Sequence, residues 1–281
     1  MTKVDEMKTV EKHTFGEVTG YELGFSPVGR PLMTVFCYVV GDILIDTGQS
    51  HMQETVLDIA NIYSVSSVLL THHHEDHSGN SAVLKQARKI PVFAHPATIE
   101  KMSGPYRVFP YQRWIWGPNT PVALDPFPDG FFEHGDLKFK AVHTPGHSRD
   151  HTSYLELNHG WLFSGDLYLG DRIKYFRADE KIADQIVSLK KILTYDFDAL
   201  FCGHRPRPMK GKRCLAAKLR FLEDFYGRVS ELADQGLDDR AIMGRLELKE
   251  QWLVRMMCFG NVSMRNMVRS AMAARRMERG D

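Results

Sequence analysis

A short stretch of the chain, Thr71–Gly79, carries four side chains that can bind metal. Its sequence is T-H-H-H-E-D-H-S-G, so that His72, His74, Asp76 and His77 form an H-x-H-x-D-H pattern. Imidazole nitrogens and carboxylate oxygens suit Zn²⁺, and imidazole also suits iron. A polar loop that is rich in histidine by chance explains four potential ligands in six residues poorly. We therefore interpret this stretch as the floor of a two-metal site.

Four other residues that could serve a metal site follow short apolar strands in the same way. Each lies close to a glycine, at the point where a predicted strand ends. Ligands in open α/β sheets collect outside the carboxyl ends of the strands, so these side chains are expected to converge on the histidine stretch. They are Asp46, His147, Asp166 and His204.

The candidate ligands divide naturally between two divalent metal ions. One ion would lie at His72, His74 and His147, the other at Asp76, His77 and His204, with Asp166 as the bridge. Two such ions about 3.5–4 Å apart can hold and activate one hydroxide. Zinc is the expected metal because it lowers the pKa of bound water to about 7; iron and manganese are the alternatives.

Composition and charge are those of a globular protein that acts in solution. The chain has 281 residues, of which 43% are hydrophobic and 25% charged, and its net charge of +1 indicates no polyanionic partner. The four cysteines form no C-x-x-C pair, which argues against a thiolate zinc site and fits a reducing, cytoplasmic location. Residues 1–12 are too charged for a secretory signal, and no apolar run is long enough for a membrane span.

Strands and helices alternate over most of the chain and then give way to helices alone. Apolar runs predict strands at 14–26, 33–40, 65–71 and 137–144 and a hairpin at 153–164. From about residue 212 apolar residues recur at helical spacing, which predicts helices at 214–233, 237–246, 251–259 and 263–277. We therefore expect a metal-binding domain over residues 1–211 and a helical region over 212–281.

The segment 104–130 is rich in proline and aromatic residues. Long segments of this kind in compact domains are usually lids or binding loops, so we expect it to cover the sheet as a lid loop and to form an apolar wall. The aromatic candidates for the substrate pocket are Tyr106, Tyr111, Trp114 and Trp116. Further candidates, close in sequence to predicted ligands, are His151, Tyr168 and Arg205.

Five motifs occur together in a fixed order along the chain. They are Asp-Thr-Gly at 46–48, T-H-x-H-x-D-H-x-G at 71–79, Thr-Pro-Gly-His-Ser at 144–148, Ser-Gly-Asp at 164–166 and Cys-Gly-His at 202–204. Over residues 14–208 this set resembles the metallo-β-lactamase-fold hydrolase superfamily. The resemblance implies an α/β fold, an αββα four-layer sandwich with a dinuclear site between two sheets, followed here by a small C-terminal helical appendage. It also implies that Asp46 supports the metal loop from behind instead of binding metal.

Departures from the branches of this superfamily narrow the choice. Asp166 occupies a position where true β-lactamases commonly carry cysteine, and His74 one where the oxygen-reducing di-iron branch has glutamate. The glyoxalase-II branch shares the ligand set, but its basic glutathione-binding pattern is not evident in the tail. The lactonase branch has a tyrosine near the position of Tyr168, and an endoribonuclease branch carries a similar helical tail. A true β-lactamase is therefore not expected.

We expect an enzyme that acts on a small-molecule ester, thioester or lactone. A hydroxide held between the metals and Asp166 would attack the carbonyl, and Asp76 would take up a proton as the leaving group departs. An endoribonuclease or phosphodiesterase of the same fold is one alternative, because the last helix could present a basic face to nucleic acid. Its basic residues are Arg265, Arg269, Arg275, Arg276 and Arg279.

A second alternative is a mononuclear iron dioxygenase acting on persulfides, which would use only His72, His147 and Asp166. The helical tail is a candidate surface for a homodimer. No membrane partner is expected.

Overall fold

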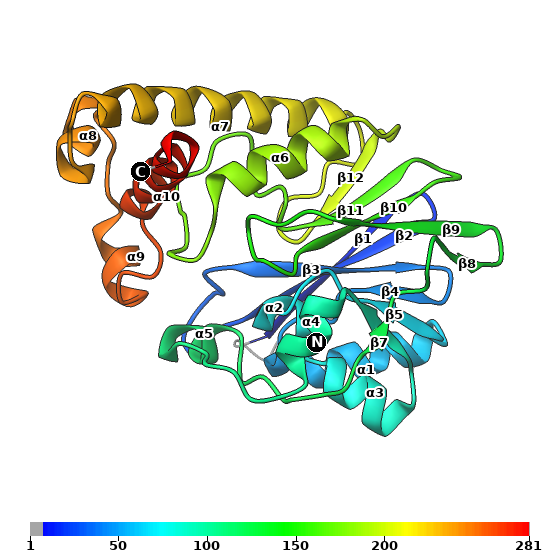
Figure 1. Ribbon diagram of the computed structural model, residues 1–281. Coiled ribbons are helices and arrows are strands. Elements are labelled where there is room, and N and C mark those ends of the chain that lie inside the picture. The colour runs from blue at the N-terminus through cyan, green and yellow to red at the C-terminus, as the bar shows by residue number, and fades with distance from the viewer. Residues whose placement is uncertain (1–7, 281) are drawn as a thin grey trace.

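Two β-sheets packed face to face form the centre of the molecule (Figure 1). The computed structural model describes residues 8–280; residues 1–7, which make up most of the charged N-terminal segment, and residue 281 lie outside the described residues. The larger sheet has seven strands in the order β1-β2-β3-β4-β5-β6-β7, and the smaller has five in the order β12-β11-β10-β9-β8.

The larger sheet is antiparallel from β1 to β4 and parallel from β4 to β7. Its strands are β1 (Lys8–Phe15), β2 (Val18–Phe25), β3 (Thr34–Val40), β4 (Ile43–Ile45), β5 (Ser67–Leu69), β6 (Val92–Ala94) and β7 (Asp125–Pro126). The smaller sheet is antiparallel except that β12 runs parallel to β11. It contains β8 (Phe132–His134), β9 (Leu137–His143), β10 (Thr152–Glu156), β11 (Trp161–Gly165) and β12 (Ala199–Cys202).

Helices cover the outer faces of both sheets (Figure 1). On the side of the larger sheet lie η1 (Ser50–Met52), α1 (Gln53–Ile62), α2 (Glu75–Ser78), α3 (Ser81–Arg88), α4 (Pro96–Met102) and α5 (Pro110–Ile115). On the side of the smaller sheet lie α6 (Ile182–Leu193), α7 (Gly211–Asp234), α8 (Asp239–Arg245), α9 (Trp252–Met257) and α10 (Met264–Arg279). None of the helices described between residues 8 and 280 has both the length and the apolar character to cross a membrane.

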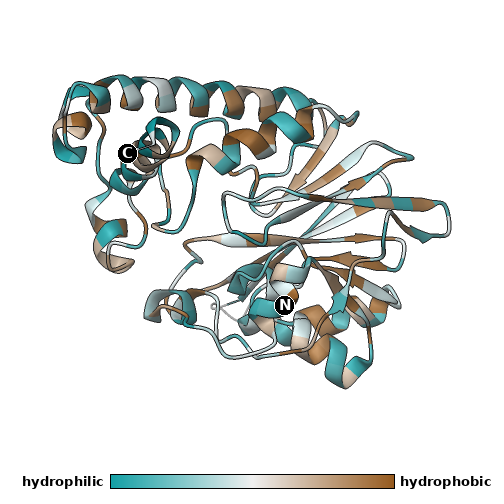
Figure 2. Ribbon diagram, in the orientation of Figure 1, coloured by the Kyte–Doolittle hydropathy of each residue, from teal (hydrophilic) through white to brown (hydrophobic). Residues whose placement is uncertain are grey.

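Side chains on alternating faces of the strands form three apolar layers, one between the sheets and one beneath the helices on each outer face. In β3, the side chains of Val35, Cys37 and Val39 pack with α1 and α3, whereas Phe36 and Tyr38 point into the space between the sheets. The period of two in a strand places successive side chains on opposite faces, and an almost continuously apolar strand is therefore buried on both. Figure 2 shows the apolar residues gathered on the strands. This is the predicted αββα sandwich.

Helix α7 joins the C-terminal helices to the smaller sheet. One face of it is buried, and that face includes Leu215, Leu222 and Val229. The same face carries Lys218, whose buried Nζ donates a hydrogen bond to the carbonyl of Leu167 at 2.6 Å. The C-terminal helices are thus anchored next to Asp166, at the end of β11.

Two local expectations were wrong. The apolar run at 14–26 is not one strand, because Gly16, with φ of +65°, and Glu17 form the turn between β1 and β2. Glycine adopts such a positive φ without strain, and a two-residue loop of this kind is the usual hairpin connection.

The expected lid at 104–130 is not loop throughout. It contains α5, which starts at Pro110, and β7, which adds a parallel edge strand to the larger sheet. Proline at the first helical position costs no hydrogen bond, and the Gln112 side chain accepts one from the Phe109 amide at 3.0 Å.

Tyr154 tests the contact between the two sheets. Its fully buried hydroxyl donates a hydrogen bond to the carbonyl of Leu70, just before the histidine stretch, at 2.9 Å. We expect Tyr154→Phe to lower the free energy of unfolding by about 1–3 kcal/mol, because it leaves a buried carbonyl without a partner. Chemical denaturation measures this, with the exposed Tyr175→Phe as the control. Equal stability of the two variants would contradict the role given to Tyr154.

Candidate metal centre

Five strand ends bring the predicted ligands together at one edge of the sandwich. In the larger sheet, Asp46 follows β4 and His72–His77 follow β5. In the smaller sheet, His147 follows β9 by a short turn, Asp166 comes directly after β11, and His204 follows β12. The candidate metal centre is therefore built between the sheets from segments far apart in the sequence.

Three histidines form the first of two clusters. The Nε2 atoms of His72 and His147 each lie 2.9 Å from Nδ1 of His74. All three side chains are buried. Three nitrogens that converge on one point in this way are the arrangement of a trigonal face of metal ligands.

The second cluster contains Asp76, His77 and His204, which the structure also brings together with Asp166. Asp76 Oδ2 lies 3.7 Å from His77 Nε2 and 3.5 Å from His204 Nε2. The two oxygens of Asp166 divide between the clusters. Its Oδ1 faces His77 Nε2 at 3.3 Å, whereas its Oδ2 faces His147 Nε2 of the first cluster at 3.3 Å.

Three of the ring nitrogens that face away from the two clusters are held by acceptors. His72 Nδ1 donates to Thr71 Oγ1 at 3.0 Å, His77 Nδ1 to Asp46 Oδ2 at 2.7 Å, and His204 Nδ1 to the carbonyl of Thr34 at 2.6 Å. In each ring Nδ1 is the hydrogen-bond donor, and Nε2 is the atom that points into the centre.

Asp46 lies against the histidine stretch, and the family resemblance implies that it supports the ligands there. Besides His77, its carboxylate accepts hydrogen bonds from the Thr71 amide at 2.8 Å and from the Thr71 hydroxyl. Its backbone has φ of +59°, a left-handed conformation that costs a residue other than glycine roughly 1 kcal/mol or more. This backbone conformation directs the carboxylate toward the back of the histidine stretch.

His72 and His74 differ in their electrostatics from His147 and from the histidines of the second cluster, whose pKa values are raised. Burial holds the pKa of His72 and of His74 well below the usual value, and the nearby Arg177 charge lowers that of His74 further. These rings are thus neutral, the form that binds metal.

In the second cluster burial also lowers the pKa of His77, but the carboxylates of Asp76 and Asp166 outweigh it, and the net shift is well upward. For the same reason the pKa of His204 rises to about 10. A cation bound there must displace these protons, and it would take over their role beside the carboxylates.

The donor set fits a pair of metal ions. His77 Nε2 and Asp166 Oδ1 are buried, and neither forms a hydrogen bond within residues 8–280. Gly203 keeps the space between them open, because a Cβ at this position would lie 2.6 Å from Asp166 Oδ1 and from His77 Cε1. Imidazoles and carboxylates around a small buried space are suited to zinc or iron.

Several residues of the centre were missed from the sequence. Thr34 lies on β3, far from every motif, and binds His204 through its backbone, which leaves no sequence signal. Glu180 lies with Oε1 3.4 Å from His147 Nδ1. Arg177 is mostly buried beside the first cluster and forms an ion pair with Asp179. Gly203 is the one whose role could have been found from the sequence, because it stands between Cys202 and the predicted ligand His204 in the Cys-Gly-His motif.

The lid places its aromatic side chains at different depths. Trp116 is buried, and its ring centroid lies 6.5 Å from that of His204. Tyr106 donates a hydrogen bond to the His73 carbonyl at 2.7 Å, and Tyr111 accepts one from Asn261. Trp114 is 51% exposed. Among these predicted pocket residues, Trp116 is therefore the one shown in contact range of the second cluster.

Two of the predicted pocket residues have other partners. His151 is fully buried, accepts a hydrogen bond from the Asp166 amide at its Nε2 and contacts Thr144 through Nδ1. It holds Asp166 in place from a fully buried position. Tyr168 packs in the apolar cluster beneath α7 and donates to Asp171. These contacts occupy its hydroxyl, contrary to a role in stabilising charge on the substrate.

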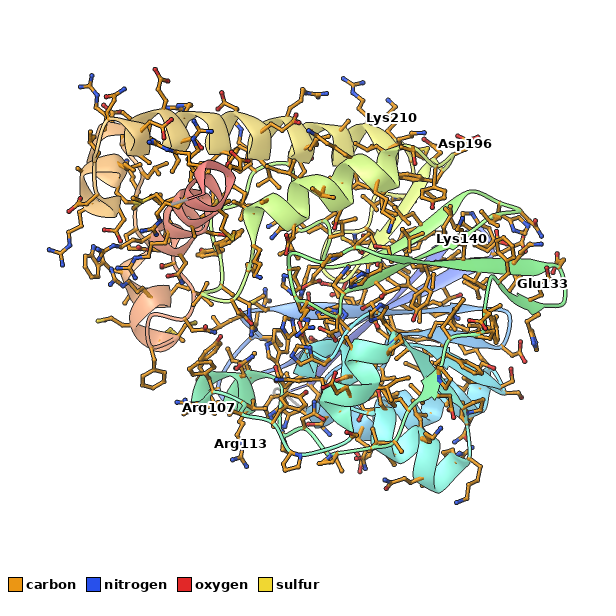
Figure 3. All side chains as sticks on the ribbon, in the orientation of Figure 1. Arg107, Arg113, Glu133, Lys140, Asp196 and Lys210 are labelled. Atoms are coloured by element: carbon orange, nitrogen blue, oxygen red, sulfur yellow. The ribbon has the colours of Figure 1, made fainter. Side chains whose placement is uncertain are left out.

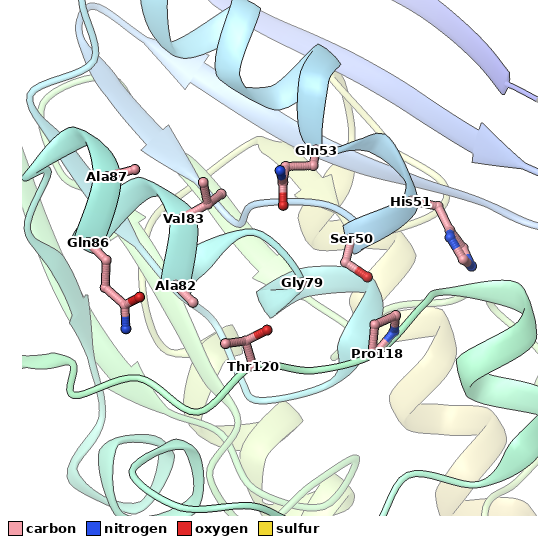
Figure 4. Close-up of a pocket in the computed structure, with 10 residues that line it drawn as sticks. All are labelled: Ser50, His51, Gln53, Gly79, Ala82, Val83, Gln86, Ala87, Pro118 and Thr120. Atoms are coloured by element: carbon pink, nitrogen blue, oxygen red, sulfur yellow. The ribbon is translucent and has the colours of Figure 1, made fainter.

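Exposed arginines and a surface pocket lie around the lid. Arg205 is exposed, and its place in a substrate pocket stays a prediction. Arg107 and Arg113 extend from the lid into solvent (Figure 3). A surface pocket between η1, α3 and the lid contains Ser50, Gly79 and Thr120 among its lining residues (Figure 4). None of the seven predicted ligands lines it, so it is not the mouth of the metal centre.

Comparison with known proteins identifies the family. A model of the metallo-beta-lactamase superfamily matches residues 30–204, which is more than half of the chain. The protein belongs to this superfamily. The family resemblance that the sequence motifs suggested is thereby confirmed.

Relatives with curated names include hydrolases. The chain is similar to a beta-lactamase-like protein 2 homolog of Drosophila melanogaster, with 30% identity over 198 residues, or 65% of this chain and 62% of that protein. It is 33% identical to a hydroxyacylglutathione hydrolase of Bdellovibrio bacteriovorus over 117 residues, 40% of this chain and 38% of that protein. Thioesterase pkgB of Emericella nidulans is 34% identical over 158 residues, which are 53% of this chain and 40% of that protein. The match thus spans less than two thirds of each relative.

Solved structures agree with the fold. A metallo-beta-lactamase from Pontibacter korlensis superposes with a TM-score of 0.59 at 18% identity and covers 77% of this chain and 100% of that one. The protein TTHA1623, solved in a di-iron-bound form, superposes with a TM-score of 0.53 at 26% identity. The match covers 69% of this chain and 97% of that one.

The position of His73 provides a control for the ligand assignment. Its Nδ1 lies 2.8 Å from Asp150 Oδ1, and so its ring is held away from the clusters, unlike those of its two neighbours. We expect Asp166→Asn and His74→Ala to lose bound metal, and His73→Ala to keep it. Metal content of the purified variants measures this. Equal loss in all three would show that the ligand face is assigned wrongly.

Asp46→Asn separates the charge of Asp46 from its backbone conformation. Asparagine tolerates a left-handed φ, so the substitution removes the charge behind His77 while the loop keeps its path. We expect metal affinity to fall about 10–100-fold, as is usual when an outer partner of a ligating histidine is lost. Titration of the apoprotein with Zn²⁺ measures it, and the exposed Asp58→Asn is the control. An unchanged affinity would rule out this role for Asp46.

Proposed function

We propose that the protein is a dinuclear metal-dependent hydrolase of carboxylic esters, thioesters or lactones. The observation that carries this proposal is the division of the Asp166 oxygens, one toward each ligand cluster. A mononuclear site at His72, His147 and Asp166 would use only the Asp166 oxygen that faces His147. Zinc is the metal we favour, and the di-iron form of the similar TTHA1623 keeps iron as the alternative.

When bound, two such ions supply a hydroxide at neutral pH and polarise the carbonyl of the substrate. The three histidines of the first cluster and Asp76, His77 and His204 would hold them, with Asp166 between. His151 and Asp46 keep Asp166 and His77 in position from behind.

Asp76 is the residue that we propose takes up the proton of the attacking hydroxide as the leaving group departs. Burial raises the pKa of its carboxyl group, but the charge of His77 outweighs burial and the net shift is downward. The carboxylate is therefore ionised at neutral pH and can accept a proton. Trp116 beside His204 helps to exclude water from this side of the centre.

The state of the basic tail favours carboxylic substrates over RNA. Arg265 and Arg269 both bind Asp239, and Arg275 and Arg279 both bind Asp234. Arginines paired in this way present less free positive charge than a phosphate backbone requires. A relative named as a thioesterase supports the same choice.

The iron dioxygenase alternative is less well supported. It would require His72, His147 and Asp166 alone, whereas here His74 approaches both histidines at 2.9 Å and a second complete cluster lies beside them.

A substrate panel tests the proposal. Purified protein of known metal content is given p-nitrophenyl esters, acyl thioesters, lactones, bis(p-nitrophenyl) phosphate, RNA and glutathione persulfide. We expect hydrolysis of the carboxylic substrates, reduced in Asp166→Asn by more than the roughly 100-fold typical of outer-sphere changes at metal sites. His73→Ala should retain it. One iron per chain with oxygen uptake on the persulfide, or RNA as the preferred substrate, would overturn the proposal.

A further inference from the structure

Helix α9 and the turn after it expose an unusual group of apolar side chains. No residue of this six-residue helix is buried. Within eight residues of the chain, five large hydrophobic side chains are between 43% and 72% exposed: Trp252, Leu253, Met256, Met257 and Phe259. Single exposed apolar residues are normal, but a contiguous group of this kind usually marks a binding surface. We call these five residues the α9 face.

The chain that follows the α9 face is fixed to the segment beside the metal centre. Residues 261–263 pair with residues 176–178: the Ala178 amide donates to the Asn261 carbonyl at 2.8 Å and the Ser263 amide to the Phe176 carbonyl at 3.0 Å. The paired segment carries Arg177 and leads to Glu180, which lies against His147. The α9 face is therefore attached directly to the wall of the first ligand cluster.

The lid meets the same place from the other side. Asn261 Nδ2 donates a hydrogen bond to Tyr111 Oη of α5 at 2.8 Å, and Figure 1 shows α9 above α5 at the same edge of the molecule. Trp114, on the same helix as Tyr111, is half exposed and adds apolar surface beside this junction. Aromatic surface from the lid and apolar surface from the helical region thus meet at this junction.

Arg177 shows how close these parts are. Its charge adds to the burial that lowers the pKa of His74, and it opposes the burial that raises the pKa of Tyr111 and of Cys258. One guanidinium is therefore within electrostatic reach of the first cluster, of the lid and of the end of α9.

The size and charge of the α9 face fit a small apolar group better than a macromolecule. A stable protein interface buries about 800 Å² on each partner and involves some 20–30 residues a side, whereas this group has five. Residues 245–259 contain three basic and two acidic side chains. Arg255 among them lies over the Trp252 ring and 3.9 Å from Glu250, which leaves the face little free basic charge for an anionic lipid surface.

We propose that the α9 face binds the apolar acyl part of the substrate, so that the enzyme prefers esters or thioesters of long acyl chains to those of short ones. The inference rests on the proposed function for the reaction itself. It assigns chain-length preference to the helical region, with the scissile carbonyl at the metal centre and the acyl chain running past the lid along α9. Every methylene removed from water on this face favours binding, so a few methylenes would dominate the preference.

A chain-length series tests the proposal. The ratio of kcat/KM for p-nitrophenyl dodecanoate to that for the acetate is measured for the wild type and for Trp252→Ser/Phe259→Ser. Both side chains are exposed, so the double variant is expected to fold. The ratio should fall at least about tenfold in this variant, since two buried methylenes already correspond to such a factor. Ile62→Ser/Val187→Ser, which removes similarly exposed apolar side chains elsewhere, should leave the ratio unchanged.

A binding measurement separates this inference from the proposed reaction. Calorimetric titration with dodecanoate should show binding that weakens in the α9 variant but not in the control, whether or not any ester is hydrolysed. Ester hydrolysis with no chain-length preference, or with a preference that the α9 variant retains, would overturn the inference and leave the proposed function intact. Sedimentation with phosphatidylcholine vesicles, or a concentration-dependent dimer, that is lost only in the α9 variant would overturn it in favour of a membrane or a second copy.

Discussion

The carboxylate of Asp46 is the interaction on which the geometry of the metal centre depends. It accepts hydrogen bonds from the amide and hydroxyl of Thr71 and from His77, and thereby joins the end of β4 to both ends of the histidine stretch. Thr71 in turn accepts from His72, so that one carboxylate orients a ligand of each cluster. Such a network stabilises the fold only if every polar group in it has a hydrogen-bond partner, since a buried polar group without one is destabilising.

The remaining ligands are held from other directions by the same principle. Glu180 faces His147, the Thr34 carbonyl binds His204, and His151 holds the Asp166 amide. These partners come from the strand β3, from the segment before α6 and from the start of β10. The sandwich thus positions the ligand side chains and also the acceptors for those of their polar atoms that face away from the clusters.

Local and distant contacts explain how much of this could be predicted. The histidine stretch and the residues at the strand ends were readable, because each ligand lies in a short motif directly after an apolar strand. Arg177 and Glu180 were not, because a single arginine or glutamate in a polar segment is usually solvated, and only the tertiary fold brings these two to the first cluster. Tyr168 was misjudged because nearness in sequence to Asp166 says nothing of direction: the chain turns after β11, and the ring packs beneath α7. The helices after residue 211 followed their apolar period closely.

Helix α7 makes the helical region part of the packing of the smaller sheet. Its buried Leu215, Leu222 and Val229 complete the apolar cover of the smaller sheet, and each such side chain contributes about 1.5–3 kcal/mol by burial. That sum is comparable with the whole stability of a typical domain. A chain cut at residue 211 would therefore expose the sheet that carries His147, Asp166 and His204, and it would lose the Lys218 bond to the Leu167 carbonyl. Substitutions in this region are therefore expected to be tolerated on its outer surfaces, and not on the inner face of α7 or at the residues of α8 and α10 that pack in the same apolar cluster.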